Sequence, residues 1–499
     1  MTLRKISLET ISQVLKVDLG KIQGEFSHVS MHSHRGGPDV LFWAVPSIRY
    51  TVEEIAQLAW RTGTIVVLAW GPEYRCFHHS EHSSKVCIVQ NFPKNTLEIL
   101  GRLFYPQRPL LKCAVTGTNG KTSTVSFLSQ LWHSSGVRWV SMGTLGMQGV
   151  PVVDFPVSTI NTADYLTFCC ALHKSSEQDV QYFACEASSH GLHQGRIPED
   201  AVDVGIWTSF SRDHLDYHTT MKNYWEAKAS LGALSRTAWL VHTEVYQKSF
   251  SMNPQGISGN PLQYGVGNAT DLWAEYDIQA QNNTHTQVSI RIDSYSWNGA
   301  VPWIGAFQCG NFTAALGAFY LLGGNLDDAF QALASGDVQV PPGRLEWVGN
   351  TSLGGRIYID YAHTPDALSH VLQVLRTLNP VRLGVVFGCG GERDRAKRKS
   401  MGAIAQRYAD WVIITDDNPR TEDPEKILDA IQQGCPRAQR IRCRSSAIKA
   451  GIFKLRQGHI LLVAGKGHET VQWIGDQAIP FQDREVIAPY VELSTANAG

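Results

Sequence analysis

The sequence predicts an α/β protein of three domains, with mostly parallel sheets covered by helices on both faces. Three observations predict this class. The chain has 499 residues, more than a single hydrophobic core usually supports. Short apolar runs alternate with helical patterns from about residue 106 onward, as parallel sheets require. Proline-rich breaks at 106–109 and 341–343 divide the chain into segments 1–105, 106–340 and 341–499.

Each segment has its own pattern of elements. The first mixes helical patterns with short strands at Val40–Val45 and Thr64–Leu68, which predicts a smaller α/β domain. The second has predicted strands at Leu110–Val115, Tyr182–Glu186 and Val204–Trp207, and predicts the central sheet. The third has strands at Ile357–Asp360, Leu383–Phe387, Trp411–Thr415 and His459–Ala464. Its strands end in polar loops, as in a Rossmann-like binding domain.

Composition excludes several classes of protein. The 44 basic and 45 acidic residues give a formal net charge of -1, so no bulk charge attracts nucleic acid or an anionic membrane. No apolar run approaches the roughly 18 residues that span a bilayer. The N-terminus lacks the continuous apolar core of a signal peptide. The ten scattered cysteines form no Cys-x-x-Cys pair, which indicates reduced thiols in a cytoplasmic protein.

The stretch AVTGTNGKTST, residues 114–124, predicts a site for a nucleotide triphosphate. A strand leads into a glycine-bracketed loop, and a helical pattern follows. Glycines let backbone N–H groups turn toward phosphate oxygens, and the helix N-terminus adds partial positive charge. Lys121 is expected at the β/γ-phosphates and Thr122 at Mg²⁺. A turn with a surface lysine is the alternative. The predicted loop comprises Gly117, Thr118, Asn119, Gly120, Lys121, Thr122 and Ser123.

Two further clusters in the central segment carry metal-binding chemistry. Glu186 ends a predicted strand, where a carboxylate facing a phosphate loop suits Mg²⁺. Asp213, His214, Asp216 and His218 lie within six residues. That density is also compatible with zinc, but no cysteine or second histidine cluster completes a tetrahedral set nearby, so Mg²⁺ is favoured.

The third segment offers groups suited to a zwitterionic amino acid. Its strands are followed by IDYAHTPDAL, GCGGERDRAKR, TDDNPRTEDP and AGKGHE. Arg393 and Arg420 are available to a carboxylate, and Glu469 to an ammonium group. With ATP and metal in one domain and an amino acid in another, ATP-driven ligation with domain closure is the simplest chemistry that uses all these groups.

These residues also carry a family resemblance. The motifs TGTNGKT, EASSHGL, SRDHLDYH, YWEAKASL, PGRLE, DYAHTPDAL, GCGGERD, DDNPR and GKGHE occur in this order. Over about residues 106–499 the chain resembles the Mur ligase family, and within it the enzymes that add the third amino acid of the peptide. The resemblance implies domains for a uridine nucleotide, ATP and an amino acid. It implies addition of meso-2,6-diaminopimelate to UDP-MurNAc-L-Ala-D-Glu through an acyl phosphate in peptidoglycan biosynthesis.

The resemblance also implies residue roles. Lys121, His214 and Lys228 would be catalytic. Lys228 would be carbamylated to N6-carboxylysine, and two Mg²⁺ sites would use Thr122, Glu186, His214 and Lys228. Asn311, Arg344, Asp360 and His363 would contact ATP. The acceptor would contact Ser33, Asn161, Thr162, Ser188, Gln194 and Arg196. The diamino acid would contact Arg393, Asp417, Asn418, Pro419, Arg420, Gly465 and Glu469, with Arg420 on the distal carboxylate. We expect a monomer without nucleic-acid or membrane partners.

Several positions depart from the family pattern and leave alternatives open. The family's Asp-Ser-Arg signature is His32-Ser33-His34, and its paired threonines appear as Asn161-Thr162-Ala163-Asp164. Ser209 and Gln308 stand where the family has asparagine. One alternative is therefore a Mur-type paralogue that ligates an amino acid to a different carboxylate acceptor in specialised metabolism. A non-enzymatic scaffold is the other alternative, and the intact Lys121, Glu186, His214 and Lys228 disfavour it.

Overall fold

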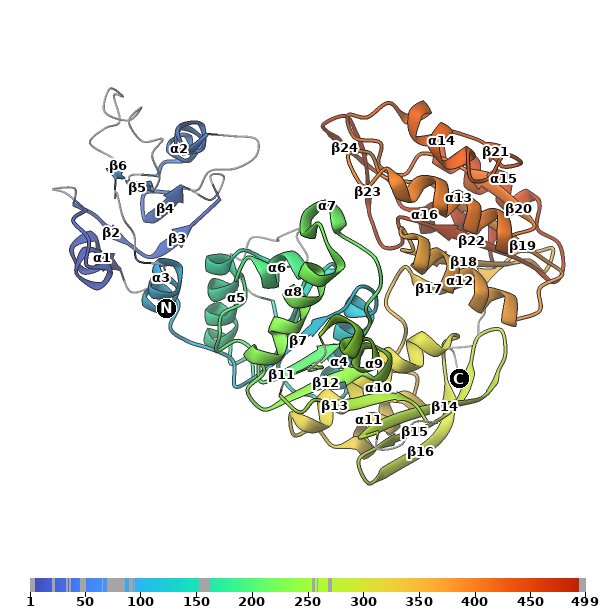
Figure 1. The fold of residues 1–499 in the computed structure, drawn as a ribbon, viewed down its shortest axis with the longest axis horizontal. Helices are drawn as coiled ribbons and strands as arrows, with labels where there is room; N and C mark the ends of the chain where they lie inside the picture. The colour runs from blue at the N-terminus through green and yellow to red at the C-terminus, as the bar shows by residue number, and fades with distance from the viewer. Residues whose placement is uncertain are drawn as a thin grey trace. The chain divides into compact units, whose positions relative to one another are not determined.

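The computed structural model describes residues 5–492, apart from 20–22, 33–34, 36, 45–50, 65, 70–85, 89–92, 94, 152–161, 254–255, 258 and 268–271. The chain forms two compact units. Figure 1 labels the helices and strands of both. The first comprises Met1–Ala114, Val137–Asp203 and Ala233–Arg236, and the second comprises Val115–Gly136, Val204–Gly232 and Thr237–Gly499. Within the described residues, none of the helices combines the length and apolarity that crossing a bilayer requires.

The first unit contains the N-terminal elements and part of the central sheet. Its elements are β1 (Ile6–Ser7), α1 (Leu8–Leu15), β2 (Glu25–Phe26), β3 (His28–Ser30), β4 (Val40–Ala44), α2 (Val52–Arg61), β5 (Val66–Ala69), β6 (Val86–Ile88), α3 (Thr96–Phe104), β8 (Trp139–Gly143), β9 (Gly146–Gly149), α5 (Tyr165–Glu177), β10 (Tyr182–Glu186) and α6 (Ser189–His193). Strands β3 to β6 form a parallel sheet. Leu8, Ile11 and Leu15 of α1 pack with Leu100 of α3 and Leu166 of α5 in one apolar cluster.

The second unit contains the rest of the central sheet and the C-terminal domain. Its central elements are α4 (Lys121–Ser134), β11 (Val204–Trp207), α7 (Leu215–His218), α8 (Met221–Leu234, whose last turn belongs to the first unit), β12 (Ala238–His242), α9 (Thr243–Met252), β13 (Leu262–Val266), β14 (Ala274–Gln281), β15 (Thr286–Ile292), β16 (Tyr295–Val301), α10 (Ala306–Leu321) and α11 (Leu326–Ala334). Strand β7 (Leu111–Thr116) passes from one unit into the other.

The central sheet has ten strands in the order β16-β15-β14-β13-β12-β11-β7-β10-β8-β9. The predicted strands at Tyr182–Glu186 and Val204–Trp207 are confirmed, and the one at Leu110–Val115 is observed as β7. The alternation of strand and helix expected up to residue 340 is wrong between residues 274 and 301, where β14, β15 and β16 form antiparallel hairpins. The reason is local: buried and half-buried residues alternate along β15, and short turns join the strands, leaving no room for crossover helices.

The C-terminal domain begins at β17 (Arg344–Asn350) and is a doubly covered sheet. Its remaining elements are β18 (Arg356–Asp360), α12 (Pro365–Thr377), β19 (Arg382–Phe387), α13 (Ala396–Tyr408), β20 (Trp411–Ile414), α14 (Pro424–Gln432), β21 (Gln439–Arg440), α15 (Arg444–Phe453), β22 (His459–Ala464), β23 (Val471–Ile474), β24 (Gln477–Pro480), α16 (Asp483–Ile487) and the 3₁₀ helix η4 (Ala488–Tyr490). The main sheet has the strand order β17-β18-β22-β19-β20-β21, and within this sheet, as far as the structure describes it, only β17 is antiparallel to its neighbour.

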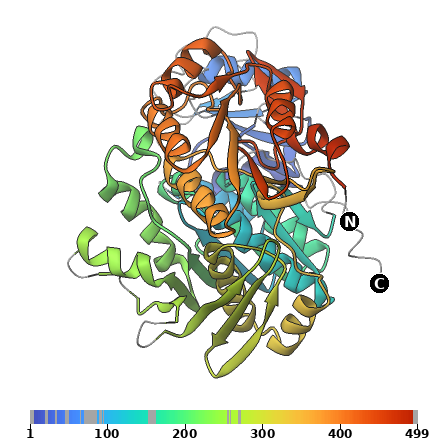
Figure 2. The ribbon, with the colours of Figure 1, turned by 90° about the vertical axis from the view of Figure 1, so that its right-hand side faces the viewer.

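Alternate residues of each C-terminal strand face opposite helical layers. Leu383, Val385 and Phe387 of β19 pack with α12, α13 and α14, whereas Val386 packs with α15 and α16. The arrangement of these helices about the sheet can be followed in Figures 1 and 2. A period of two along a strand puts successive side chains on opposite faces, so a continuous apolar run is the pattern of a strand buried on both sides. Because the helices cover the two faces of the sheet, loops lie at the carboxyl ends of these parallel strands.

Candidate functional site

The phosphate-type loop predicted at residues 117–120 follows β7 and precedes α4. Gly117 has φ 155° and Gly120 has φ 89°, backbone conformations that favour glycine. A Cβ on Gly120 would lie 2.4 Å from Asn311 Oδ1, so this position has no room for a side chain. The loop is held from the segment after β11: Ser209 Oγ accepts the N–H of Asn119 at 2.8 Å, and Thr208 Oγ1 donates to the Asn119 carbonyl at 2.6 Å. Ser209 thus supports this loop through its hydroxyl.

Two lysine ammonium groups converge on one carbonyl of this loop. Lys121 Nζ donates to the Gly117 carbonyl at 2.7 Å, and Lys228 Nζ donates to the same oxygen at 2.8 Å. Lys228 lies on α8 and is only 1% exposed, although its sequence context alone is that of a surface lysine. Burial, together with the charge of Lys121, holds the pKa of Lys228 well below its usual value. The structure therefore brings Lys121 and Lys228 together, and Lys228 loses its proton more readily than an exposed lysine does.

Helix α8 reaches the loop because aromatic residues anchor it. Trp207, Phe210, Tyr224 and Trp225 belong to one buried cluster, with Trp207 and Trp225 ring centroids 4.4 Å apart. Tyr224 also lies beside Lys228, whose Nζ is 4.9 Å from the ring centroid, and its hydroxyl is 3.0 Å from Thr118 Oγ1. The aromatic cluster therefore fixes Lys228 against the loop.

His214 lies in the segment between β11 and α8. It has φ 52°, and its Nε2 lies 3.3 Å from Asp213 Oδ2. Burial opposes charge on Asp213, but the nearby His214 and His363 hold its pKa below its usual value. His218 is buried against Tyr224, with ring centroids 5.3 Å apart. In the parts of the chain that the structure describes, no group of three or more His, Cys, Asp or Glu side chains is placed to hold a metal ion.

Two of the four residues predicted to contact ATP, Arg344 and Asn311, lie beside the loop and the first turn of α4. Arg344 donates from Nη2 to Thr122 Oγ1 at 2.9 Å, and its guanidinium lies 4.5 Å from the Tyr361 ring centroid. Gln308 Nε2 donates to the Arg344 carbonyl at 2.8 Å, and Asn311 Nδ2 donates to Gln308 Oε1 at 3.2 Å. Gln308 thus joins two of the predicted contacts. Asp360 accepts the N–H groups of Leu345 and Ala362, and burial raises its pKa to about 6.

His363 follows β18 by three residues and belongs to the same region. Its Nδ1 lies 2.8 Å from the Tyr361 carbonyl, and its ring lies 4.6 Å from that of Tyr361, measured between centroids. Ser123 is buried in the first turn of α4, next to Thr122. Arg344 and Asn311 therefore lie beside the loop and the first turn of α4, whereas Asp360 and His363 contact Leu345, Ala362 and Tyr361, and ATP binding by all four stays a prediction.

In the first unit, Glu186 and the predicted acceptor contacts form a second cluster. Glu186 is 2% exposed, and its two carboxylate oxygens accept the N–H and the hydroxyl of Thr144 at 2.8 and 3.0 Å. Thr162 Oγ1 donates to the Glu186 carbonyl and accepts the N–H of Ser188. Arg196 donates to the Thr162 carbonyl at 2.9 Å and to Gln194 Oε1 at 2.8 Å. Thr162, Ser188, Gln194 and Arg196 are thus brought together, while Ser33 and Asn161 lie outside the described residues.

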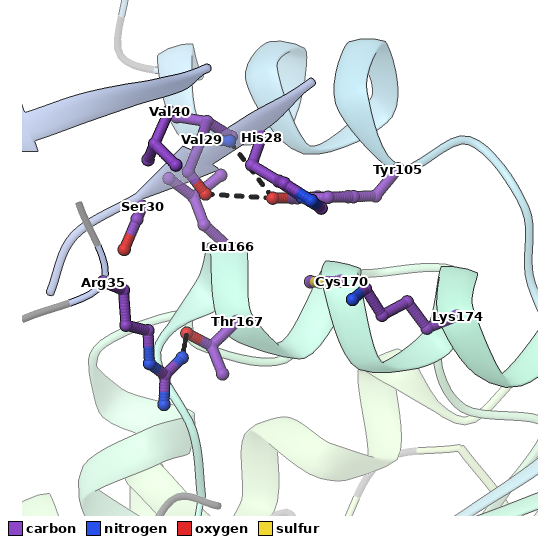
Figure 3. A pocket seen from close by; sticks show the side chains of 10 residues that line it. All are labelled: His28, Val29, Ser30, Arg35, Val40, Tyr105, Leu166, Thr167, Cys170 and Lys174. Atoms are coloured by element: carbon purple, nitrogen blue, oxygen red, sulfur yellow. Dashed lines mark hydrogen bonds between the residues drawn. The ribbon is translucent and has the colours of Figure 1, made fainter. Parts of the chain in front are cut away.

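A pocket of about 220 Å³ lies in the same unit, between β3 and α5. Figure 3 shows Tyr105 and Arg35 approaching from the N-terminal segment, opposite Leu166, Thr167, Cys170 and Lys174 of α5. Arg35 Nη1 donates to Thr167 Oγ1 at 3.3 Å. Beside it, His32 Nε2 lies 2.7 Å from Asp164, which also caps the N-terminus of α5. Each of these two contacts joins residues 132 positions apart. The pocket has both cationic and apolar lining residues, and the sequence patterns did not predict it.

The loops after β19, β20 and β22 meet in the C-terminal domain. Arg420, with φ 52°, donates from Nη1 to the Gly391 carbonyl at 2.9 Å. Asn418 Nδ2 donates to Glu469 Oε2 at 2.8 Å, and a Cβ on Gly465 would lie 2.6 Å from Asp417 Oδ2. Pro419 is buried beside Gly391, whereas Arg393 is exposed. Glu469 Oε2 also accepts Lys466 Nζ at 2.8 Å, while the Glu469 side chain stays 28% exposed, so its role toward an ammonium group stays a prediction.

Sequence reasoning missed three ion pairs that support these loops. Lys466 is fully buried against Glu469. Arg398 makes two 2.8 Å hydrogen bonds to Glu422, and Arg444 makes two 2.7 Å hydrogen bonds to Asp483. Of these three ion pairs, only the one of Lys466 could have been suspected from the sequence, because Lys466 lies inside the AGKGHE motif together with Glu469.

Comparisons with known proteins agree with this architecture. Residues 115–319 match the Mur ligase middle domain, and residues 343–467 match the Mur ligase, glutamate ligase domain. UDP-N-acetylmuramoyl-L-alanyl-D-glutamate--2,6-diaminopimelate ligase of Rickettsia conorii is 40% identical over 82% of this chain and 85% of its own length. The protein of the same name from Rickettsia prowazekii is 36% identical over 93% of this chain and 95% of its own length.

Solved structures show the same fold. A structure of UDP-N-acetylmuramoyl-L-alanyl-D-glutamate--2,6-diaminopimelate ligase is 29% identical, with a TM-score of 0.62 over 98% of this chain and 99% of that one. MurF ligase from Thermotoga maritima in complex with ADP has a TM-score of 0.60 over 88% of this chain and 93% of that one, at 17% identity. With the two matching domains and relatives of up to 40% identity, the chain belongs to the Mur ligase family.

Proposed function

We propose that this chain is an ATP-dependent ligase that adds meso-2,6-diaminopimelate to UDP-MurNAc-L-Ala-D-Glu in peptidoglycan biosynthesis. The observation that carries the proposal is that relatives 36–40% identical over 82–93% of this chain bear the name of that ligase. The proposal assigns the acceptor to residues 1–105 and neighbouring parts of the central segment, ATP to 106–340, and the amino acid to 341–499. A monomeric cytoplasmic enzyme is part of the proposal, and the eight cysteines whose side chains the structure describes are free thiols.

The chemistry requires activation of a carboxylate, which is a poor electrophile. ATP supplies the phosphoryl group that turns it into an acyl donor with a good leaving group. In this chain the backbone of Gly117–Gly120 and the ammonium group of Lys121 would offset charge on the transferring phosphoryl. Asn311, Arg344, Asp360 and His363 would hold the nucleotide around the same loop.

Hard oxygen donors fit the expected Mg²⁺ ions. Thr122 lies in the first turn of α4, and Glu186 ends β10, each at the position proposed for a metal ligand. His214 is the proposed imidazole ligand. A carbamate on Lys228 would supply further oxygens, and the depressed pKa of Lys228 supports this modification because only the neutral amine attacks carbon dioxide.

The test of the proposal is phosphate release from ATP and Mg²⁺ with UDP-MurNAc-L-Ala-D-Glu, with and without meso-diaminopimelate or L-lysine. We expect release that requires both the nucleotide dipeptide and diaminopimelate. Lys121→Ala serves as the inactive control, because it removes a charge that contacts the phosphate loop. Lys222→Ala, an exposed lysine on α8, serves as the active control. No release with either amino acid, from a protein that binds ATP, would reject this acceptor.

That rejection would favour the second candidate, a Mur-type ligase with a different carboxylate acceptor. The observation behind it is the altered first segment, where His32 faces Asp164 at 2.7 Å. Both family models begin after this segment, at residues 115 and 343. Phosphate release with another carboxylate and the same amino acid would support this candidate.

Carbamylation of Lys228 predicts a dependence on dissolved carbon dioxide. In a degassed, bicarbonate-free buffer, activity should fall severalfold and return when bicarbonate is added. Lys228→Ala should lack activity and gain part of it from added short carboxylates, because a carboxylate can replace the carbamate. ¹³C NMR with labelled bicarbonate should show a carbamate carbon in the wild type only. A wild type that is indifferent to bicarbonate and shows no carbamate signal would contradict the modification.

The pocket between β3 and α5 is our proposed site for the nucleotide end of the acceptor. Its apolar walls and the cations Arg35 and Lys174 suit a base or sugar joined to a diphosphate. Arg35→Gln should raise the KM of the nucleotide dipeptide by about tenfold and leave the KM of diaminopimelate unchanged, because a charged hydrogen bond is lost. Steady-state kinetics with Arg61→Gln, on the neighbouring α2, as control would check this. An unchanged acceptor KM would exclude Arg35 from the site.

Arg420 is proposed to bind the distal carboxylate of the diamino acid. Arg420→Ala should raise the KM of diaminopimelate by about tenfold or more, because a planar two-point contact to a carboxylate is lost. L-Lysine has no distal carboxylate, so the discrimination between the two amino acids should shrink in the variant. Competition assays with both amino acids would measure this, and an unchanged preference would refute the assignment.

A further inference from the structure

Lys466 is a fully buried lysine whose ammonium group has all its hydrogen bonds within the C-terminal domain. It follows β22 by two residues and is 0% exposed. Nζ donates to Asn418 Oδ1 at 3.1 Å, to Glu469 Oε2 at 2.8 Å and to the Val471 carbonyl at 2.7 Å. An ammonium group has three donors, so the three acceptors satisfy it. Because a buried charge is costly without partners, this geometry fixes the side chain in one position.

The partners of Lys466 include two of the residues proposed to bind the amino acid. Glu469 accepts from Lys466 and Asn418 through the same oxygen, Oε2. The Glu469 side chain remains 28% exposed, so the carboxylate is held from its buried side and is still reached by solvent. Lys466 therefore orients this carboxylate, which cannot rotate without breaking two hydrogen bonds.

The same contacts extend to Arg420 through β23. Lys466 holds the first residue of this strand through the Val471 carbonyl, and the side chain of Asn418 accepts the N–H of Trp473 at 3.0 Å. Trp473 in turn accepts the N–H of Arg420 at 3.1 Å, and the Arg420 carbonyl accepts the N–H of Gly475 at 2.8 Å. These bonds support Arg420 in its left-handed backbone conformation, φ 52°. One buried ammonium thus connects the proposed acidic and basic ends of the amino-acid site.

We propose that Lys466 is a positioning residue for the incoming diamino acid: its ammonium holds Glu469, Asn418 and strand β23 in one frame, so that Glu469 and Arg420 present a fixed pair of opposite charges. This inference rests on the proposed function, because it names the substrate class as an amino acid with an ammonium group and a distal carboxylate. A fixed pair lowers the entropy lost on binding, so Lys466 acts on affinity for this substrate without touching it.

The test compares Lys466→Met with the wild type and with Lys112→Met. Methionine keeps much of the length and removes the charge and the three donors. Lys112 is a matched control, since it is a lysine 3% exposed that bonds Asp203 and the Pro109 carbonyl, and it has no place in the proposed sites. We expect Lys466→Met to raise the KM of diaminopimelate by about tenfold or more, with the KM values of ATP and the nucleotide dipeptide within about twofold. Lys112→Met should lower the thermal midpoint and change none of the three KM values.

A double-mutant cycle with Glu469→Gln separates positioning from a general loss of structure. If Lys466 acts by holding Glu469, the two substitutions together should raise the KM of diaminopimelate much less than the product of their separate effects. Lys466→Arg, which keeps a charge and several donors, should retain more affinity than Lys466→Met. It also preserves the comparison if the methionine variant fails to fold. Independent effects of Lys466 and Glu469, or equal rises in all three KM values, would overturn the proposal.

The outcome for Lys466 is distinguishable from the outcome for the proposed function. A wild type that turns over no diamino acid refutes the function, whereas an active wild type with an unchanged KM in Lys466→Met refutes only the positioning role. Calorimetric titration of diaminopimelate into wild type and Lys466→Met, each with ADP and the nucleotide dipeptide, gives the same comparison without turnover. Equal affinities in that titration would also overturn the role of Lys466.

Discussion

The convergence of Lys121 and Lys228 on the Gly117 carbonyl is the interaction on which the rest of the central site depends. Lys121 Nζ and Lys228 Nζ meet at one oxygen, at 2.7 and 2.8 Å, and the buried Lys228 also donates to Thr116 Oγ1 at 3.5 Å. Like charges so close repel each other in a medium of low dielectric constant, and an anion placed between them relieves the repulsion. The glycine loop, the aromatic anchor of α8 and the supports from Thr208 and Ser209 are all needed to hold this arrangement. A phosphate group, a carbamate, or both would satisfy the excess positive charge.

The C-terminal domain contains another buried lysine, Lys466, whose charge is paired with a carboxylate. Lys466 is paired with Glu469, and its remaining donors bond the side chain of Asn418 and the backbone of Val471. Here a carboxylate compensates the charge, so Lys466 contributes rigidity and no net charge, whereas burial and the charge of Lys121 lower the pKa of Lys228. Arg398 and Arg444 are likewise compensated by carboxylates, those of Glu422 and Asp483, and each ion pair supports a loop at the carboxyl ends of the strands. The domain thereby leaves Arg393 and Arg420 as cations for a ligand.

Positions that depart from the family pattern are accommodated locally. Ser209 accepts the N–H of Asn119, and Gln308 joins Asn311 to Arg344. In the first unit, His32 is paired with Asp164, and Arg35 reaches Thr167 three residues further along α5. Ser209 keeps a polar group within hydrogen-bonding distance of the loop, and Gln308 keeps one between Asn311 and Arg344. At the third position an imidazole, His32, stands where the family has an aspartate, and it lies 2.7 Å from Asp164 in the unit that holds the proposed acceptor pocket.

The sequence by itself determined the strands and the loops that follow them, because apolar runs, glycines and motif order are local properties. It placed Tyr182–Glu186, Val204–Trp207 and His459–Ala464 with the observed bounds, and it identified the loop at Gly117–Gly120. It could not show that β14 to β16 form antiparallel hairpins, since short β runs are ambiguous until their turns and partners are known. Only the tertiary structure decided that Lys228 is buried against the loop. It alone also decided that Lys466 donates a hydrogen bond to Glu469 and that the His32 ring lies within hydrogen-bonding distance of Asp164. Each of these contacts depends on the packing of elements or loops around it, and the charges, burial and pKa shifts follow from that packing rather than from the residue type.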